Sequence, residues 1–223
     1  MKKNLFLEAI MKFLLGVVLV GVLVFLPAGT FGFFGGWLLM AVLFVPMFLA
    51  GLVMIKKNPN LLRSRLDAKE KRAEQDLVVK LSGLMFLVGF AVAGLDFRFG
   101  WLRLPSWVNW TAAALFLLAY ILYAEVLREN TYLSRTIGVQ EGQKVVDTGL
   151  YGIVRHPMYS ATLLLFLSVP FVLGSALSFV CFLCYPALIV KRLKNEEELL
   201  TKELEGYADY KQKVKFRLIP GIW

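Results

Sequence analysis

The chain is poor in the residues that build metal sites and nucleophile–base pairs. It has a single histidine, His156, and two cysteines, Cys181 and Cys184, among 223 residues. The cysteines form a C-x-x-C inside an apolar run, with no second pair and no histidine beside them. We therefore interpret them as small packing residues rather than as redox or metal-binding groups. No metal ligand set is expected in this protein.

Charge is absent over long stretches, which excludes an ordinary soluble domain. Hydrophobic residues make up 58% of the chain, and the mean hydropathy is +0.66, whereas soluble domains are about half apolar or less. Five apolar runs stand out, at 5–26, 31–55, 77–97, 107–127 and 158–190. The first four each have the roughly 20 residues that a helix needs to cross a bilayer. The sequence therefore predicts an integral membrane protein.

The fifth apolar run, 158–190, is too long for one membrane helix. As a single helix its 33 residues would extend about 50 Å, well beyond a bilayer core of roughly 30 Å. Pro170, Gly174 and Ser175 near its midpoint predict a turn, and Pro186 predicts a kink in the second arm. We expect an all-α polytopic membrane helix bundle of about six membrane helices. These include a C-terminal helical hairpin, followed by a cytosolic amphipathic helix.

Basic residues are placed unevenly, and their positions predict the topology. Counted together, the N-terminus and three later segments hold 23 of the 25 Lys and Arg residues, the segments being 56–80, 128–155 and 191–217. Only Arg98 and Arg103 remain for the other side. Because basic loops collect on the cytoplasmic side, six passes place all of these segments inside. We expect a multi-pass protein of the inner or plasma membrane with both termini cytoplasmic.

The net charge of +9 has an ordinary explanation in that topology, since anionic lipid headgroups attract basic residues beside the membrane. Nucleic acid is not an expected partner, because the aromatic residues lie in the spans. A non-enzymatic transporter or assembly protein stays open but is less favoured, since ionisable residues within the spans are scarce. We interpret 1–223 as one domain, with four spans in 1–127 and the loop, hairpin and last helix in 128–223. In the charged loop 56–76, Pro59 marks a helix start, and an interfacial helix is expected.

Polar residues at the near end of the hairpin have the features of a ligand site. Pro157 suits the first turn of a helix, so His156 is expected at the start of the first arm. The helix dipole, together with Arg155, would attract a carboxylate, and the rings of Tyr151 and Tyr159 would attract a cation. This combination suits a zwitterion. The alternative is that these are ordinary residues of the membrane interface.

The far end of the hairpin carries a second polar group. Arg192 and Glu196 are spaced i, i+4 on the expected continuation of the last span, with Glu197 alongside. A solvated ion pair is the alternative interpretation. Folding of the hairpin would bring this group to His156, where an arginine could fix a substrate carboxylate and a glutamate could hold an amine or a ribose hydroxyl.

The C-terminal part of the chain resembles the isoprenylcysteine carboxyl methyltransferase family and its phospholipid-methylating relatives. The resemblance rests on four motifs: Gln140-x-Gly142-x-x-Val145-Val146, Gly149-x-Tyr151-x3-Arg155-His156-Pro157-x-Tyr159, Arg192-x3-Glu196-Glu197 and Gly206-Tyr207-x-x-Tyr210. It implies a membrane enzyme that uses S-adenosylmethionine, enclosed between the loop, the base of the hairpin and the C-terminal helix. A lipophilic methyl acceptor would enter from the bilayer.

The resemblance also implies roles for individual residues. Arg192 corresponds to the arginine on the acceptor side, and Glu197 is a candidate base, although the choice between Glu196 and Glu197 as the cofactor contact is open by one position. Gln143 stands where the family often has a histidine, which leaves a neutral hydrogen-bonding contact. The implied cofactor contacts are Gln140, Gln143, Lys144, Val145, Val146, Tyr151, His156, Pro157, Met158, Tyr159 and Glu196.

The expected reaction is carboxyl O-methylation of an isoprenylcysteine-like or other lipophilic acceptor. A carboxylate is already ionised at neutral pH and needs no general base, whereas an ammonium acceptor must first lose a proton. Phospholipid N-methylation and methylation of a small thiol are the alternatives within this class. A membrane reductase with a similar hairpin is a further alternative.

Overall fold

The computed structural model describes residues 2–66, 73–102, 104–133 and 138–223, and all of its regular structure there is helical. The long helices are α1 (Lys2–Ala28), α2 (Phe34–Lys57), α4 (Ala73–Phe99), α5 (Ser106–Glu129), α6 (Pro157–Leu173) and α8 (Tyr185–Glu203). The short ones are α3 (Pro59–Leu66), η1 (Gly149–Gly152), α7 (Ala176–Phe182) and α9 (Tyr207–Lys213). The predicted all-helical polytopic bundle is confirmed.

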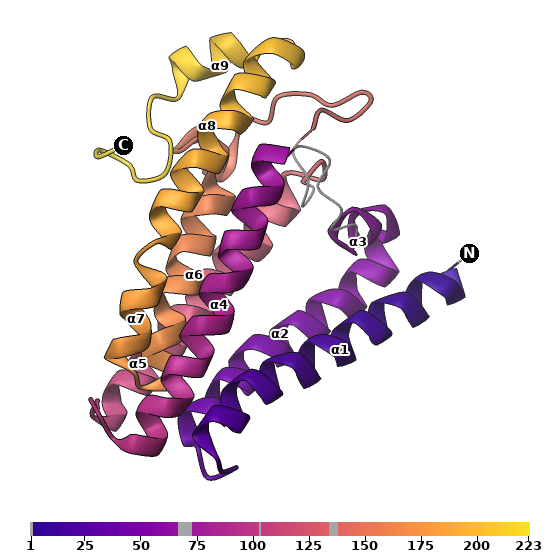
Figure 1. Cartoon of the computed structure of the whole chain (residues 1–223). Helices are drawn as coiled ribbons and strands as arrows, with labels where there is room; N and C mark the ends of the chain where they lie inside the picture. The colour runs from indigo at the N-terminus through magenta and orange to yellow at the C-terminus, as the bar shows by residue number, and fades with distance from the viewer. Residues whose placement is uncertain (1, 67–72, 103, 134–137) are drawn as a thin grey trace.

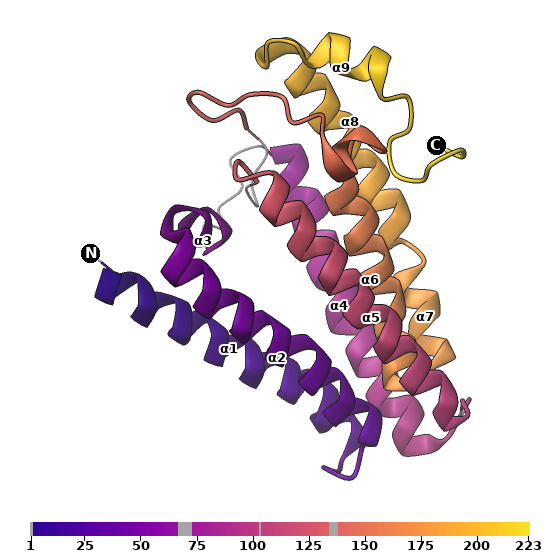
Figure 2. The same cartoon turned by 180° about the vertical axis from the view of Figure 1, so that it is seen from behind.

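Five helices are long and apolar enough to cross a membrane, with α7 and α8 counted together as 176–203. The sixth traverse is α6, whose 17 residues span about 26 Å at 1.5 Å per residue. Because successive traverses alternate in direction, the N-terminus and the C-terminal segment belong to the same end of the bundle (Figures 1 and 2). We call this the polar end; α2, α5 and α8 finish there, and α4 and α6 begin there. The opposite end is the turn end.

The C-terminal apolar run folds back on itself, as predicted. The first arm ends at Gly174, which takes a left-handed conformation (φ +77°) that glycine adopts without the usual steric cost. Ser175 caps the next helix by accepting a hydrogen bond from the Ser178 amide. Pro170 lies inside α6 rather than in the turn. The second arm is interrupted before Tyr185, and Pro186 stands near the start of α8 instead of kinking a continuous helix.

A buried carboxylate holds the turn end of the hairpin. Asp96 of α4 is 2% exposed and accepts hydrogen bonds from the Ser175 hydroxyl (2.5 Å) and the Leu102 amide (2.8 Å). Asn109 of α5 donates to the Val172 carbonyl at 3.0 Å. These hydrogen bonds join α4 and α5 to the turn. They attach the hairpin to the bundle at the end opposite the polar end.

The helices form two groups that meet mainly near the turn end. Figures 1 and 2 show α1 and α2 side by side, leaning away from α4 to α8 towards the polar end. α5 packs closely on α6, while α4 contacts both α1 and the second arm of the hairpin. At Gly94 an added Cβ would lie 2.8 Å from the Val24 carbonyl oxygen, so the α1–α4 crossing depends on glycine. α3 is the helix expected after Pro59; residues 67–72 of the charged loop lie outside the described residues.

Candidate active site at the base of the hairpin

A polar pocket lies at the polar end, where α6 begins and α8 finishes. It is enclosed by the α5–η1 loop, η1, the first turn of α6, the last turns of α8, and α9. Its lining residues are Asn130, Tyr132, Leu133, Gly138, Gln143, Lys144, Val145, Val146, Tyr151, Arg155, His156, Met158, Tyr159, Arg192, Glu196, Leu200, Leu204, Tyr207 and Tyr210. Segments about forty residues apart therefore share one cavity, as the hairpin prediction requires.

The α5–η1 loop is shaped by its own glutamines. Gln140 donates its side-chain amide to the Tyr132 carbonyl (2.5 Å), and its backbone amide donates to the Gln143 side chain at 2.9 Å. Gly142 between them has φ +70°, the left-handed region that glycine favours. Gln143 lines the pocket whereas Gln140 does not. Gln140 therefore shapes the loop, and the structure does not bring it to the cavity as a cofactor contact.

The turn η1 carries Tyr151 into the pocket wall. Both carboxylate oxygens of Glu129 accept from the Leu150 amide (2.9 and 3.1 Å), and Gly149 takes φ +54° at this point. The Tyr151 hydroxyl accepts from Asn130 at 3.1 Å, and its carbonyl accepts from the Tyr210 hydroxyl at 2.7 Å. Burial raises the pKa of the Tyr151 phenol, so this ring is neutral at physiological pH.

His156 caps α6 with Pro157 as the first helical residue, as predicted. Its backbone is held by the C-terminal segment, because the amides of Arg155 and His156 donate to the carbonyls of Phe216 and Arg217, each at 2.9 Å. The Ser160 hydroxyl donates to the Leu218 carbonyl at 2.7 Å. The segment that follows α9 is therefore bound along the start of α6, and it fixes the direction from which His156 faces the pocket.

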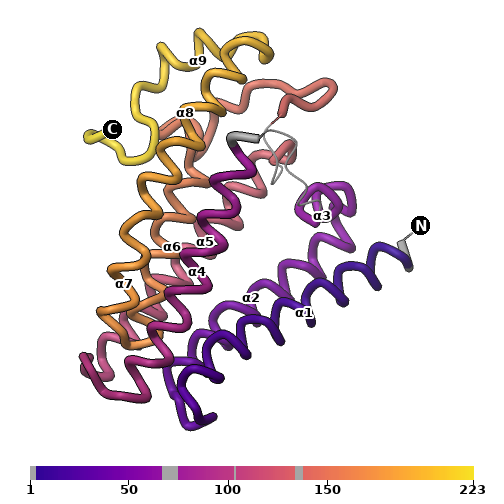
Figure 3. The backbone as a smooth tube through the Cα atoms, viewed as in Figure 1, coloured from indigo at the N-terminus to yellow at the C-terminus, as the bar shows by residue number. Residues whose placement is uncertain are grey.

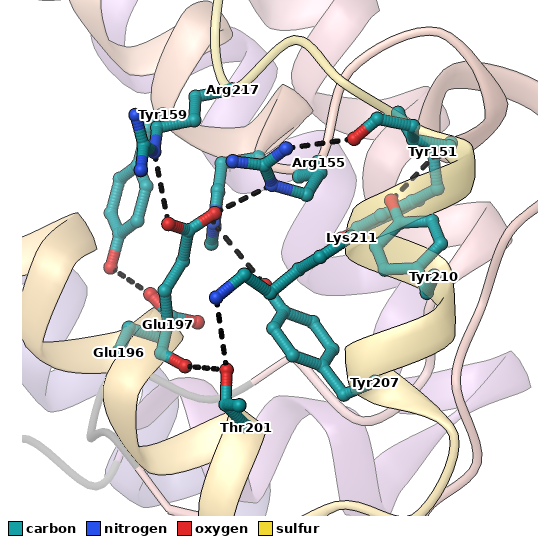
Figure 4. Close-up of polar contacts among 12 residues, drawn as sticks. Tyr151, Arg155, Tyr159, Glu196, Glu197, Thr201, Tyr207, Tyr210, Lys211 and Arg217 are labelled. Carbon is teal, nitrogen blue, oxygen red and sulfur yellow. Dashed lines mark hydrogen bonds and ion pairs between the residues drawn. The ribbon is translucent and has the colours of Figure 1, made fainter.

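Glu197 is the carboxylate that Arg155 binds at the start of α6. Its side chain lies between Arg155 (Nε–Oε1, 2.6 Å) and Arg217 (Nε–Oε2, 2.9 Å), with His156 Nε2 at 3.3 Å (Figure 4). Arg155 also donates to the carbonyls of Val214 and Lys215. Arg155 therefore binds a carboxylate of the protein itself, and it also lines the pocket. Glu197, expected as a candidate base, does not line the pocket.

Glu196, one residue earlier on α8, points in a different direction around the helix and lines the pocket. It accepts a hydrogen bond from the Tyr159 hydroxyl (Figure 4), and the Tyr159 hydroxyl also accepts from Arg192 Nε at 3.2 Å. The His156 ring lies against Tyr159 with centroids 5.7 Å apart. Arg192, Tyr159 and Glu196 therefore form a connected polar row along one wall of the cavity.

Most of the residues that the sequence nominates share this pocket. Arg192 lines it, as do nine of the eleven expected cofactor contacts, the exceptions being Gln140 and Pro157. Reasoning from the sequence passed over Asn130, Tyr132, Leu200 and Leu204, which carry no distinctive motif. Tyr207 and Tyr210 were recognised as a motif but given no role; their i, i+3 spacing on α9 was the available signal. Burial raises the pKa of the Tyr207 phenol, so it too is a neutral hydrogen-bonding group.

The fold and the pocket define a class of protein, a polytopic helical membrane protein with a tyrosine-rich polar cavity at one end of the bundle. Within the described residues, no group of three or more His, Cys, Asp or Glu could hold a metal ion. The phospholipid methyltransferase family model matches residues 107–206, somewhat less than half of the chain. The resemblance to the membrane methyltransferases is confirmed by this match, which includes the pocket except for the segment after Gly206.

Two curated relatives are sterol reductases. The Delta(14)-sterol reductase TM7SF2 of Mus musculus is 32% identical over 91 residues, and the Delta(14)-sterol reductase of Methylotuvimicrobium alcaliphilum is 28% identical over 93. Each match covers 40% of this chain and 22% of the relative. The chain therefore matches about a fifth of the length of these relatives.

Proposed function

We propose that the protein is an S-adenosylmethionine-dependent methyltransferase that acts on a lipophilic acceptor. The polar end of the bundle lies on the cytoplasmic side of an inner or plasma membrane. The observation that carries the proposal is the cavity shared by Tyr151, His156, Tyr159 and Glu196, because these positions carry the methyltransferase motifs. The family match over 107–206 supports the same class of enzyme.

The residues present fit the proposed cofactor. The faces of Tyr151, Tyr159, Tyr207 and Tyr210 can attract a sulfonium cation, and all four side chains line the cavity. The Glu196 carboxylate is an acceptor for an amine or a ribose hydroxyl. Val145 and Val146 from the loop, with Leu200 and Leu204 from α8, offer apolar walls for the flat purine ring.

The proposed chemistry needs positioning more than acid–base groups. When bound, S-adenosylmethionine supplies an electrophilic methyl group that an in-line nucleophile can take. Arg192 would hold a carboxylate acceptor through its guanidinium and bring it to the cavity from the membrane side. Correct alignment can lower the barrier by about 7 to 11 kcal/mol. A carboxylate acceptor needs no base, which agrees with Glu197 being committed to Arg155 and Arg217. We therefore favour carboxyl O-methylation of an isoprenylcysteine-like or other lipophilic acid.

Methyl transfer from a labelled cofactor tests the proposal directly. Membranes that contain the protein are incubated with methyl-labelled S-adenosylmethionine, and the labelled product is isolated and treated with mild base. Release of volatile label is expected, because a methyl ester is hydrolysed whereas an N-methyl or S-methyl group is not. Base-stable label would instead support phospholipid N-methylation or methylation of a small thiol.

A reductase is the second candidate, and the similarity to the two sterol reductases favours it. Heat protection of the purified protein separates the two functions. S-adenosylmethionine should raise the unfolding temperature whereas NADPH should not, because a ligand stabilises only the state that binds it. The reverse result would assign the pocket to a nicotinamide cofactor.

Arg192 separates cofactor binding from transfer within the proposed function. We expect Arg192→Ala to keep the heat protection by S-adenosylmethionine and to lose most of the methyl transfer, since we assign the guanidinium to the acceptor. Arg128→Ala is a suitable control, because that arginine is exposed and pairs with Glu125 on α5. Loss of heat protection in Arg192→Ala would move this arginine to the cofactor.

A further inference from the structure

A second polar hollow lies outside the pocket, between α8, α9 and the C-terminal segment. Its lining residues are Lys194, Glu197, Glu198, Thr201, Lys202, Lys211 and Arg217. Four of these seven side chains are cationic and two are anionic, so the hollow has an excess of positive charge. It has no part in the proposed reaction, and two of its cationic residues, Lys211 and Arg217, lie beyond the segment that the family model matches.

Two of its cations are not neutralised by the protein. Glu198 pairs with Lys202, and Glu197 is held between two arginines. Lys194 and Lys211 have no carboxylate partner within the described parts of the chain. Lys211 donates to the neutral Thr201 hydroxyl at 3.3 Å (Figure 4). Two ammonium groups are thus available for an anion.

The C-terminal segment beside the hollow exposes apolar side chains in a regular order. Phe216 is 37% exposed, Ile219 49% and Ile222 77%, and the basic residues Lys215 and Arg217 flank Phe216. Side chains of this kind beside a row of cations are typical of segments that lie in the membrane interface.

The C-terminal segment is held by hydrogen bonds and by packing against the core. The Trp223 carbonyl accepts from the amides of Leu218 and Ile219, and the Arg217 guanidinium lies 5.1 Å from the centre of the Trp223 ring. Leu218 is buried in the main core, and Trp223 packs against that core. Figure 3 shows the C-terminus returning beside α8 rather than extending beyond α9. The exposed apolar side chains are therefore presented by a fixed backbone next to the membrane-spanning helices.

We propose that the hollow and residues 215–223 form a binding site for an anionic phospholipid of the leaflet at the polar end. Lys194 and Lys211 bind the headgroup phosphate, while Phe216, Ile219 and Ile222 rest in the upper part of the acyl layer. Each juxtamembrane cation attracts an anionic leaflet, and tryptophan favours the same depth. A free phosphate ion would make no use of the three apolar side chains. Arg217 borders the hollow and also holds Glu197, so a bound lipid touches the network that fixes His156.

Native mass spectrometry of the full chain in a neutral detergent tests the site, with phosphatidylglycerol and phosphatidylcholine as the two probes. We expect the first lipid to bind more tightly than the second. The double variant Lys194→Gln with Lys211→Gln should weaken phosphatidylglycerol binding about tenfold or more. The matched control is Lys56→Gln with Lys57→Gln, which removes the same charge at the same end of the bundle and should leave the affinity within about twofold. Equal binding of both lipids, or an equal loss in the control, would overturn the proposal.

A second pair of measurements separates a lipid from a free anion. The triple variant Phe216→Ser, Ile219→Ser and Ile222→Ser should bind phosphatidylglycerol several-fold more weakly while its helical circular dichroism is unchanged. Inorganic phosphate at millimolar concentration should not displace the lipid from the wild type. Displacement by inorganic phosphate together with full affinity in the triple variant would make the hollow a phosphate site, and the lipid assignment would be wrong.

Discussion

The hairpin has a buried carboxylate at each end, and the two differ in what surrounds them. Asp96 at the turn end accepts from neutral donors, the Ser175 hydroxyl and the Leu102 amide. Glu197 at the polar end is held by two guanidinium groups, with the His156 ring nearby. Both are well satisfied, and the second adjoins the pocket through its partners Arg155 and His156, which line it. The difference indicates that the turn end is a structural joint, whereas the polar end positions residues around a ligand.

The free energy lost when either carboxylate is removed depends on the charge of its hydrogen-bonding partners. Removing Asp96 leaves neutral groups without an acceptor, and some of them can rotate or find another partner. Removing Glu197 leaves the Arg155 guanidinium buried without a counter-charge, which is a larger cost. The two carboxylates should therefore differ both in their effect on stability and in their effect on ligand binding.

Glu197→Ala should have the largest effect. We expect it to lower the free energy of unfolding by about 3 to 5 kcal/mol and to weaken cofactor binding, because Arg155 and His156 both line the pocket. Unfolding in mixed micelles and a cofactor titration measure the two effects. Glu198→Ala is the matched control, since its carboxylate is exposed and pairs with Lys202. Equal stability of the two variants would contradict the buried network.

Asp96→Ala should have a smaller effect on stability and none on cofactor binding. Loss of the shared acceptor for Ser175 and Leu102 should cost about 1 to 3 kcal/mol, while the dissociation constant of the cofactor stays at the wild-type value. Asp96→Asn keeps one carbonyl oxygen and should recover part of the stability. If Asp96→Ala weakened cofactor binding as much as Glu197→Ala does, the two ends of the hairpin would not be separate in function.

Gly149→Ala separates ligand binding from stability at the polar end. The added Cβ meets the Glu129 carboxylate, and a left-handed alanine costs about 1 to 2 kcal/mol. We expect η1 to shift, Tyr151 to move and cofactor affinity to fall more than overall stability does. Gly83→Ala on α4 is the control, because its Cβ would meet nothing within 4 Å. An unchanged dissociation constant in Gly149→Ala would remove η1 from the site.

Lys213→Gln should have the smallest effect. Lys213 pairs with Asp147 at 2.6 Å on the surface, and its hydrogen bond lowers the pKa of the Asp147 carboxyl. A carboxyl with a lowered folded-state pKa stabilises the fold above its ordinary pKa of about 3.9, and this contribution is lost as the pH falls through the lower folded value. Exposed pairs contribute little, so no measurable change in the unfolding midpoint is expected at pH 7. A clear midpoint shift at pH 7 would assign Lys213 a role beyond this exposed pair.

The hairpin and the meeting of its ends could be predicted because both depend on the length of the apolar run and on the turn-forming residues within it. A run of apolar residues too long for one span, with Gly174 and Ser175 near the middle, leaves few alternatives to a fold-back, and the fold-back brings residues 156 and 196 together. The placement of His156 before Pro157 follows from the helix-starting preference of proline. These features are local or set by the thickness of the bilayer.

The assignment of the two neighbouring glutamates could not be predicted. Glu196 and Glu197 are adjacent on one helix, about 100° apart around its axis, so a small rotation decides which faces the pocket. The deciding partner is Arg217, which comes from a segment beyond α9 that no motif connects to α8. The position of Gln140 outside the pocket lining could not be predicted for a related reason, because its bond to the Tyr132 carbonyl depends on the path of the loop.

Calorimetric titration of the purified protein with S-adenosylhomocysteine tests the central claim most directly. We expect the wild type to bind this product and Glu196→Ala to weaken binding by about 2 kcal/mol or more, roughly 30-fold, because the pocket then lacks its only carboxylate among the described lining residues. Wild-type affinity in Glu196→Ala, or no binding by the wild type, would contradict it.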